Sequence, residues 1–311
     1  MNYPIFFDST NSSNLFGLNE NLKFFSSLYK NKKLPKVLML TGDKGTGKST
    51  LVNHFLFSIF DENNYDNKKL IYNSKSNFLN QFKNNLIPNV IYFKGSDFKN
   101  TKVEDIRDLK TKIFQSIISN YERFIVFDDI ELFNINSLNA LLKIIEEPTH
   151  NNHFFLINNK AKPLPETIKS RSIEYKIILN ENQRISIIDN LVKMFKLELV
   201  LDPLFVKISP GNFVKFNYIF KEYNISPSED FVENLSKLLS LYKKNKDILY
   251  INLTFFLADY YFSDLKQKKF LKNDQIYEIK NFIFNNLNSF LMYNINQSAL
   301  INAVNNRLKN E

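Results

Sequence analysis

The residues best suited to chemistry lie in a glycine-rich segment near the N-terminus. Residues 42–49 read Gly-Asp-Lys-Gly-Thr-Gly-Lys-Ser, which fits the pattern G-x-x-x-x-G-K-S. The glycines of this pattern allow a tight turn in which successive backbone N–H groups point at phosphate oxygens. Its lysine reaches the outer phosphates, and its serine hydroxyl binds Mg²⁺. The predicted phosphate ligands are Gly42, Gly45, Gly47, Lys48, Ser49 and Thr50, and Ser49 is also a predicted magnesium ligand.

A pair of carboxylates is the second chemical feature. Residues 124–127 form an apolar run typical of a strand buried on both faces, and Asp128 and Asp129 follow at its end. Open α/β sheets bind their ligands at the carboxyl ends of their strands. One carboxylate could hold magnesium through water, and the next could orient an attacking water molecule. Because Asp-Asp is also common in ordinary turns, it is the phosphate loop upstream that favours the functional interpretation.

The elements that must position these residues alternate between strands and helices. A short apolar strand precedes the phosphate loop, and an amphipathic helix follows it and directs its N-terminus at the anion. Further helices are predicted at residues 19–30, 101–109 and 137–147, and further strands at residues 90–93, 153–159 and 173–178. Residues 61–85 are weakly periodic and are predicted to be a loop with a poor helix. This alternation predicts an α/β fold with a mostly parallel sheet covered by helices on both faces.

From residue 180 onward the pattern becomes entirely helical. Asn180 and Gln183 form a potential capping box, and residues 209–212 interrupt the pattern before a helix that reaches Phe220. Residues 226–229, Ser-Pro-Ser-Glu, have the composition of a helix N-terminus with Ser226 as the cap. These breaks predict three domains: a nucleotide-binding domain at 1–178, a helical lid at 179–225 and an all-α collar at 226–311.

Composition excludes several classes of protein. The 311 residues include no cysteine, so disulfides and thiolate zinc sites are excluded. Three histidines are too few for a histidine-based metal cluster, and His150 and His153, which follow Pro148 in a polar segment, are expected at the surface. The N-terminus does not resemble a signal peptide, and the most apolar run, residues 248–262, is too short to span a bilayer. We therefore expect a cytoplasmic protein without membrane contact.

Four motifs in a fixed order resemble the clamp-loader branch of the AAA+ ATPases. After the phosphate loop come Phe-Asp-Asp at 127–129, Asn-Ala-Leu-Leu-Lys at 139–143, Glu-Glu-Pro at 146–148 and Ser-Arg-Ser at 170–172. They look like the Walker B, "NALLK-x-x-EEP" and "SRC" motifs of that family, and the resemblance covers residues 14–178. It implies that ATP and Mg²⁺ are the cofactors, with Ser49 and Asp128 at the magnesium positions. It also implies that Asn159 occupies the first sensor position and that Arg171 is an arginine finger acting in trans on a neighbouring subunit.

Departures from the ATPase pattern favour the delta-prime branch of the family over its gamma/tau motor subunits. Asp129 stands where the motors carry the catalytic glutamate, and Asn212 stands where an arginine usually reads the gamma-phosphate. The zinc-binding cysteines that often follow the phosphate-loop helix are absent. The resemblance therefore implies a subunit that binds nucleotide, hydrolyses it weakly or not at all, and donates Arg171 to its neighbour.

The resemblance also implies partners. They are the gamma/tau and delta subunits of a five-membered hetero-oligomeric ring, the sliding clamp through that ring, and primed DNA. The net charge of +9, together with Lys102 and Arg107 in one predicted helix, is consistent with contacts to the DNA backbone. Two alternatives stay open: a gamma/tau-type motor that hydrolyses ATP at its own loop, and another AAA+ protein that remodels DNA directly.

Overall fold

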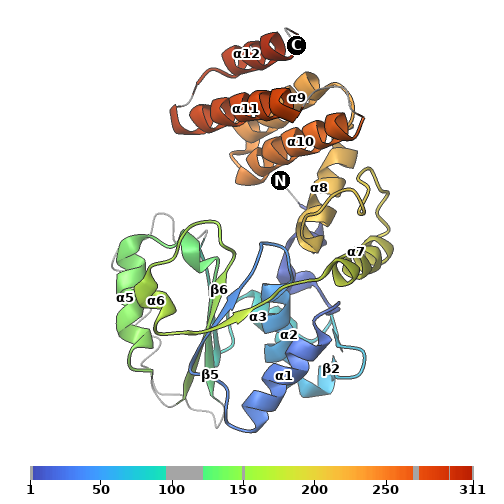
Figure 1. Ribbon diagram of the computed structural model, residues 1–311. Coiled ribbons are helices and arrows are strands. Elements are labelled where there is room, and N and C mark those ends of the chain that lie inside the picture. The colour runs from blue at the N-terminus through green and yellow to red at the C-terminus, as the bar shows by residue number, and fades with distance from the viewer. Residues whose placement is uncertain (1–2, 96–121, 149–150, 269–272, 294, 310–311) are drawn as a thin grey trace. The chain divides into compact units, whose positions relative to one another are not determined.

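The computed structural model describes residues 3–95, 122–148, 151–268, 273–293 and 295–309 (Figure 1). The chain forms two compact units. One consists of Tyr3–Phe195 and Ile208–Asn212, and the other of Lys196–Lys207 and Phe213–Glu311. The division into three domains stays a prediction, and the helix predicted at 101–109 lies outside the described residues. Each unit is described by itself.

A five-stranded sheet is the framework of the first unit. Its order is β4 (Val90–Lys94), β5 (Arg123–Asp128), β6 (Asn152–Asn158), β1 (Val37–Thr41) and β7 (Ile173–Lys176). Every neighbouring pair of these strands is parallel. The carboxyl ends of β4, β5, β6 and β1 therefore meet at one edge, which brings the phosphate loop after β1 beside Asp128. The parallel sheet predicted from the sequence is confirmed.

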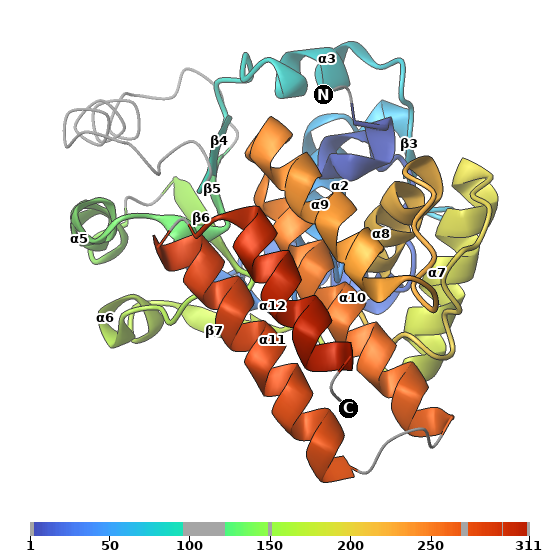
Figure 2. The same cartoon turned by 90° about the horizontal axis from the view of Figure 1, so that it is seen from above.

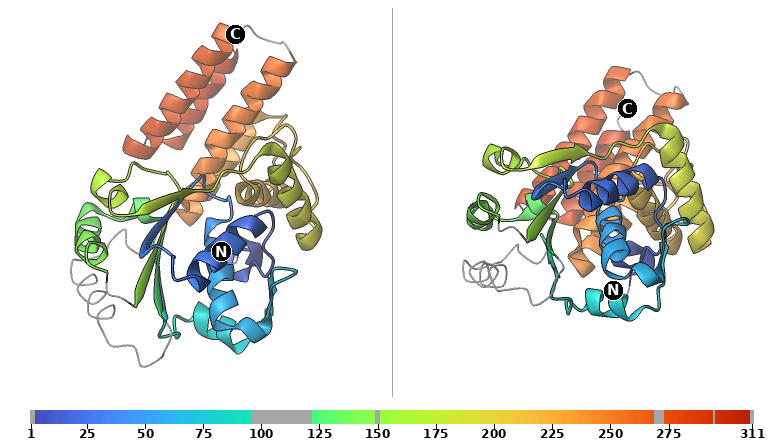
Figure 3. Two further views of the ribbon diagram at one scale, coloured as in Figure 1. Left: turned by 60° about the horizontal axis from the view of Figure 1, so that its bottom comes forward. Right: turned by 90° about the horizontal axis from the view of Figure 1, so that it is seen from below.

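Helices cover both faces of this sheet (Figures 1 and 3). On one face lie α1 (Asn19–Lys30), α2 (Lys48–Phe60) and α3 (Asn77–Lys83), and on the other lie α5 (Ile135–Ile145) and α6 (Glu166–Lys169). Successive β5 residues alternate between the two cores: Phe124 and Val126 pack toward α1 and α2, while Ile125 and Phe127 pack toward α5. Because each face needs apolar side chains, the strand is a continuous apolar run.

The region predicted as a loop with a poor helix contains more structure than expected. Besides α3, it forms the short antiparallel pair β2 (Tyr65–Asp66) and β3 (Ile71–Tyr72). The 3₁₀ helices of this unit are η1 (Ile5–Phe7), η2 (Ser9–Asn11), η3 (Glu62–Asn64) and η4 (Ile130–Leu132). Tyr72 stacks on Phe57 of α2 with ring centroids 4.3 Å apart, so aromatic packing anchors β3 where sequence periodicity is weak.

The surface position expected for His153 is wrong. His153 lies within β6 and is only 4% exposed, and its Nε2 lies 2.9 Å from Oε2 of Glu122. The ring stacks on Phe124, its partner in β5, with ring centroids 5.4 Å apart, and this packing keeps it from the surface. His150 lies outside the described residues.

Local capping signals succeeded at one helix and failed at another. Helix α7 (Glu181–Phe195) begins with the predicted capping box: the Gln183 N–H donates to Asn180 Oδ1 at 2.9 Å, and the Asn180 N–H donates to Gln183 Oε1 at 3.0 Å. Ser226 is not a cap, because the next helix begins at Phe231. The Asn234 amide instead donates to the Ser226 carbonyl at 2.8 Å, which holds the preceding residues in a turn.

The second unit contains most of α8 (Pro210–Glu222), then α9 (Phe231–Asn245), α10 (Ile248–Gln267), α11 (Asn273–Tyr293) and α12 (Gln297–Lys309). Helices α9 to α12 pack as a bundle in which α9 contacts α10 and α12, and α11 contacts α10 and α12 (Figure 2). Its core includes Leu238, Leu257, Ile283 and Val304, one from each helix and all fully buried. None of the described helices has the length and apolar character needed to cross a membrane.

Candidate nucleotide-binding site

The phosphate loop joins β1 to α2 in the conformation that its glycines require. Gly45 and Gly47 have φ values of +88° and +91°, in the left-handed region where glycine carries no steric penalty. Gly47 is the N-cap of α2, so the predicted ligands Lys48, Ser49 and Thr50 form the first turn of that helix. The first N–H groups of a helix lack intrahelical acceptors and favour an anion. The loop therefore has the backbone of a phosphate site.

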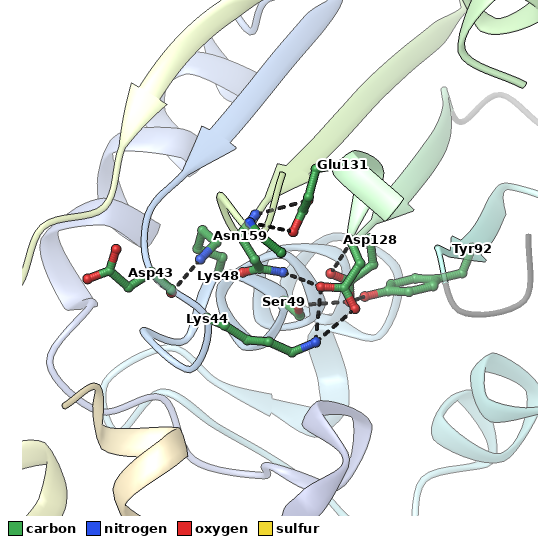
Figure 4. A network of polar contacts seen from close by, with 10 residues as sticks. Asp43, Lys44, Lys48, Ser49, Tyr92, Asp128, Glu131 and Asn159 are labelled. Atoms are coloured by element: carbon green, nitrogen blue, oxygen red, sulfur yellow. Dashed lines mark hydrogen bonds and ion pairs between the residues drawn. The ribbon is translucent and has the colours of Figure 1, made fainter. Parts of the chain in front are cut away.

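Lys48 is buried inside this loop. Its side chain is only 2% exposed, and Nζ donates to the carbonyl oxygens of Gly42 and Asp43, both at 2.7 Å (Figure 4). Burial lowers the pKa of Lys48 to about 8, although the nearby carboxylates, of which Asp128 acts most strongly, favour the charged form. A buried ammonium that is costly to keep charged is well placed to gain from an anionic ligand.

The pKa of Lys48 leads to a testable pH dependence. Phosphate oxygens favour the charged lysine, so nucleotide binding above pH 8 must take up a proton. The fraction of Lys48 that carries a charge falls about tenfold between pH 7 and pH 9. We therefore expect the affinity for Mg–ATP to be about tenfold weaker at pH 9 than at pH 7. Isothermal titration calorimetry in buffers of different ionisation enthalpy measures both the affinity and the proton uptake.

Lys48→Arg is the control, because a guanidinium stays charged throughout this range. Its affinity for Mg–ATP should change little between pH 7 and pH 9. If the wild type and this variant have parallel pH profiles, Lys48 is not the titrating group.

Asp128 and Ser49 form the predicted magnesium pair. The Ser49 hydroxyl donates to Asp128 Oδ2 at 2.9 Å, and the Tyr92 hydroxyl donates to the same oxygen at 2.7 Å (Figure 4). Burial and the neighbouring Asp129 raise the pKa of Asp128, while the two hydroxyl donors oppose that rise. Sequence reasoning missed Tyr92, whose contact follows from the pairing of β4 with β5.

Asp129 is engaged from two sides. Its Oδ1 accepts from Asn159 Nδ2 at 2.6 Å, and Lys44 Nζ lies 3.3 Å from Oδ1 and 3.2 Å from Oδ2. Glu131 is a second carboxylate that sequence reasoning missed: it is 4% exposed and accepts from the Asn159 N–H at 3.1 Å. Burial raises the pKa of Glu131. The structure thus joins the predicted sensor Asn159 to the predicted catalytic position.

The residues present fit a magnesium–nucleotide complex. Ser49 and Asp128 offer the hard oxygen ligands that Mg²⁺ prefers. Lys48 brings a buried positive charge to the loop whose helix N-terminus already favours anions. The side chains of all three lie in one network at the carboxyl edge of the sheet (Figure 4).

Ser209 and the first turn of α8 lie directly against the phosphate loop. The Ser209 hydroxyl donates to the Lys44 carbonyl at 2.5 Å, and the Gly211 N–H donates to the Gly45 carbonyl at 2.9 Å. A Cβ on Gly45 would lie 2.8 Å from the backbone nitrogen of Asn212, so only glycine fits there. Asn212 therefore lies beside the loop, and its short amide side chain carries no charge.

Arg171 makes its contacts elsewhere. Its Nε donates to Glu146 Oε1 at 2.7 Å and its NH1 donates to the Thr167 carbonyl at 3.1 Å, with the side chain partly exposed. These partners belong to the α5 and α6 face of the sheet, and they orient the guanidinium without covering it. Lys102 and Arg107, the residues predicted to contact DNA, lie outside the described part of the chain.

Comparison with protein families decides the assignment. The model of the family described as "DNA polymerase III, delta subunit" matches residues 17–181, more than half of the chain. The chain belongs to this family. The match covers the phosphate loop, the carboxylates and Arg171, and it confirms the resemblance to the clamp-loader branch of the AAA+ ATPases.

Curated relatives carry names from the same complex. A DNA polymerase III subunit delta' of Buchnera aphidicola subsp. Schizaphis graminum is 27% identical over 205 residues, which cover 61% of this chain and 60% of the relative. A subunit gamma of Buchnera aphidicola subsp. Acyrthosiphon pisum is 26% identical over 147 residues, 47% of this chain and 39% of the relative. The chain thus spans less than two thirds of either relative. A gamma subunit-related protein of Thermotoga maritima aligns over 90% of this chain and 96% of its own, at 13% identity and a TM-score of 0.46.

Proposed function

We propose that this chain is a delta-prime-type subunit of a bacterial clamp loader that binds Mg–ATP and hydrolyses it slowly. One observation carries the proposal. The phosphate loop and its magnesium pair are intact, with Ser49 2.9 Å from Asp128, whereas the catalytic-position carboxylate Asp129 is held by other side chains. Such a site is built to hold nucleotide and poorly built to activate water.

Each residue of the site would have a separate role in binding Mg–ATP. The Lys48 ammonium would neutralise the outer phosphates, and the N–H groups of the first turn of α2 would donate to their oxygens. Ser49 and Asp128 would hold Mg²⁺, which when bound supplies charge neutralisation for the phosphate oxygens. Asn159 holds Asp129 through its amide and Glu131 through its backbone N–H, and so links the two carboxylates.

Arg171 would act on the nucleotide of a neighbouring subunit. Its exposure leaves the guanidinium accessible, and its bonds to Glu146 and Thr167 limit its conformational freedom. A finger that is already oriented loses less entropy when it reaches an anion. The family membership supports this role through the Ser-Arg-Ser motif at 170–172.

The proposed partners are the gamma/tau and delta subunits in one ring, the sliding clamp through that ring, and the backbone of primed DNA. With such partners, the proposed localisation of the protein is the cytoplasm. The relatives named delta' and gamma support the assembly, since both are DNA polymerase III subunits.

A gamma/tau-type motor is the second candidate. The complete phosphate loop favours it. Burying the charged Lys48 costs folding free energy, and a subunit with only a structural role would have no need of that lysine. The two candidates differ in turnover. The motor requires Asp129 to activate water, whereas the delta-prime assignment does not.

The test is calorimetry combined with an ATPase assay on the isolated chain. We expect one Mg–ATP site per chain and a turnover well below about 1 s⁻¹, the lower end of ordinary enzymes. Failure to bind Mg–ATP would refute the nucleotide proposal, and a turnover at or above that rate would favour the motor.

A further inference from the structure

The phosphate loop carries a second lysine that the motif does not use. Lys44 Nζ lies within hydrogen-bond distance of both Asp129 oxygens, at 3.2 and 3.3 Å, while Asn159 donates to one of them at 2.6 Å. The Lys44 side chain is 55% exposed, and that of Asp129 is 19% exposed. A carboxylate at the catalytic position is thus enclosed by an ammonium and an amide.

The backbones at both ends of this ion pair are held in place. The Lys44 carbonyl accepts from Ser209, and the next carbonyl, of Gly45, accepts from Gly211. Asp129 has a φ of +54°, and its N–H donates to Asp128 Oδ1 at 3.0 Å. Surface ion pairs are usually weak partly because two mobile side chains must be ordered. Here that cost is reduced, since each side chain starts from a fixed backbone.

We propose that Lys44 restrains Asp129 and is a cause of the slow hydrolysis at this site. A water molecule that is to be oriented by Asp129 must compete with Lys44 for a carboxylate oxygen, because Asn159 already occupies the other. Asp129 then serves as a tie between the phosphate loop and β5 and not as the residue that activates water. This inference rests on the proposed binding of Mg–ATP and adds the residue that limits its turnover.

The same position allows a different role, in which Lys44 leaves Asp129 and binds the phosphates. The two roles make opposite demands. A restraining lysine slows turnover and contributes little to affinity, whereas a phosphate ligand strengthens affinity and assists turnover. Asp129 favours the first role, because it holds the ammonium with both oxygens.

The experiment compares Lys44→Met with Lys160→Met in the full chain. Lys160 is a matched control. It is a similarly exposed lysine at the carboxyl edge of the sheet, and its Nζ lies 3.9 Å from Asp43 instead of contacting Asp129. We expect Lys44→Met to raise single-turnover hydrolysis of Mg–ATP about two- to fivefold, the factor that an exposed ion pair is worth. Lys160→Met should stay at the wild-type rate. The double variant Lys44→Met/Asp129→Asn should lose the gain.

A second readout does not depend on activity. A carbodiimide joins an ammonium and a carboxylate in direct contact as an amide, so peptide mass spectrometry of the treated wild type should find Lys44 linked to Asp129. Asp129→Asn should abolish that link. Absence of the link, or a turnover that is unchanged or lower in Lys44→Met, would overturn the restraint.

Calorimetry separates the remaining outcomes. An affinity for Mg–ATP more than about tenfold weaker in Lys44→Met would identify Lys44 as a phosphate ligand and overturn the restraint, while the proposed function stands. A wild type that does not bind Mg–ATP would overturn the proposed function itself.

Discussion

Arg171→Ala in this subunit should lower ATP hydrolysis at the facing site of an assembled clamp loader by about 10³–10⁵-fold, the usual worth of an arginine finger. A guanidinium aimed at the gamma-phosphate stabilises charge that develops in the transition state. Only the site that faces this subunit would lose that help, so the total ATPase rate should fall partially unless the sites fire in an obligatory order. The measurement is DNA- and clamp-stimulated ATPase of the reconstituted ring.

The fold should tolerate this change. Arg171 is partly exposed, and its pair with Glu146 has the modest stability expected of a surface ion pair. Lys169→Ala is the matched control, since Lys169 is an exposed cation two residues away that pairs with Glu166. Unchanged hydrolysis and clamp loading in an Arg171→Ala ring of intact mass would contradict the finger assignment.

Lys48→Met should weaken nucleotide binding and stabilise the nucleotide-free protein. Losing a charged donor to phosphate oxygens removes about 3–5 kcal/mol, or roughly 10²–10⁴ in affinity, if two charge-assisted hydrogen bonds are lost. The stabilisation arises because the buried charge of Lys48 is unfavourable when no nucleotide is bound. Lys48 has a pKa of about 8 in the fold against 10.5 in the unfolded chain, so the unfolded chain binds more protons between these pH values and stability rises with pH across that window.

At pH 7 the charged lysine therefore costs the fold up to about 3 kcal/mol, because burial lowers its pKa from 10.5 to about 8. Methionine removes this cost but leaves the Gly42 and Asp43 carbonyls without their donor, which offsets part of the gain, so we expect a net stabilisation of about 1–2 kcal/mol. Calorimetric titration and thermal unfolding at pH 7 measure the two effects. A variant that melts below the wild type without nucleotide would show that Lys48 stabilises the loop.

The sheet and the core of the site were predictable because their signals are local. Glycines at fixed spacing dictate the loop, and a continuous apolar run before Asp128 dictates a buried strand. Strand order then places Ser49 beside Asp128 with no further information. The capping box at Asn180 is local in the same sense and was also confirmed.

Contacts between distant segments were not predictable in this way. Tyr92 reaches Asp128 because β4 pairs with β5 in a particular register, which single-sequence periodicity does not specify. Lys44 occupies a variable position of the loop pattern, so its pair with Asp129 carries no sequence signal. At Ser226 a local cap signal lost to a longer-range bond from Asn234. Tertiary contacts override propensity at such places.

Native mass spectrometry of this chain mixed with the gamma/tau and delta subunits of its own organism tests the central claim most directly. We expect a hetero-oligomer of five subunits that contains this chain once and forms with Mg–ATP present. A chain that stays apart from those subunits, or that forms rings only with copies of itself, would contradict the assignment as a clamp-loader subunit.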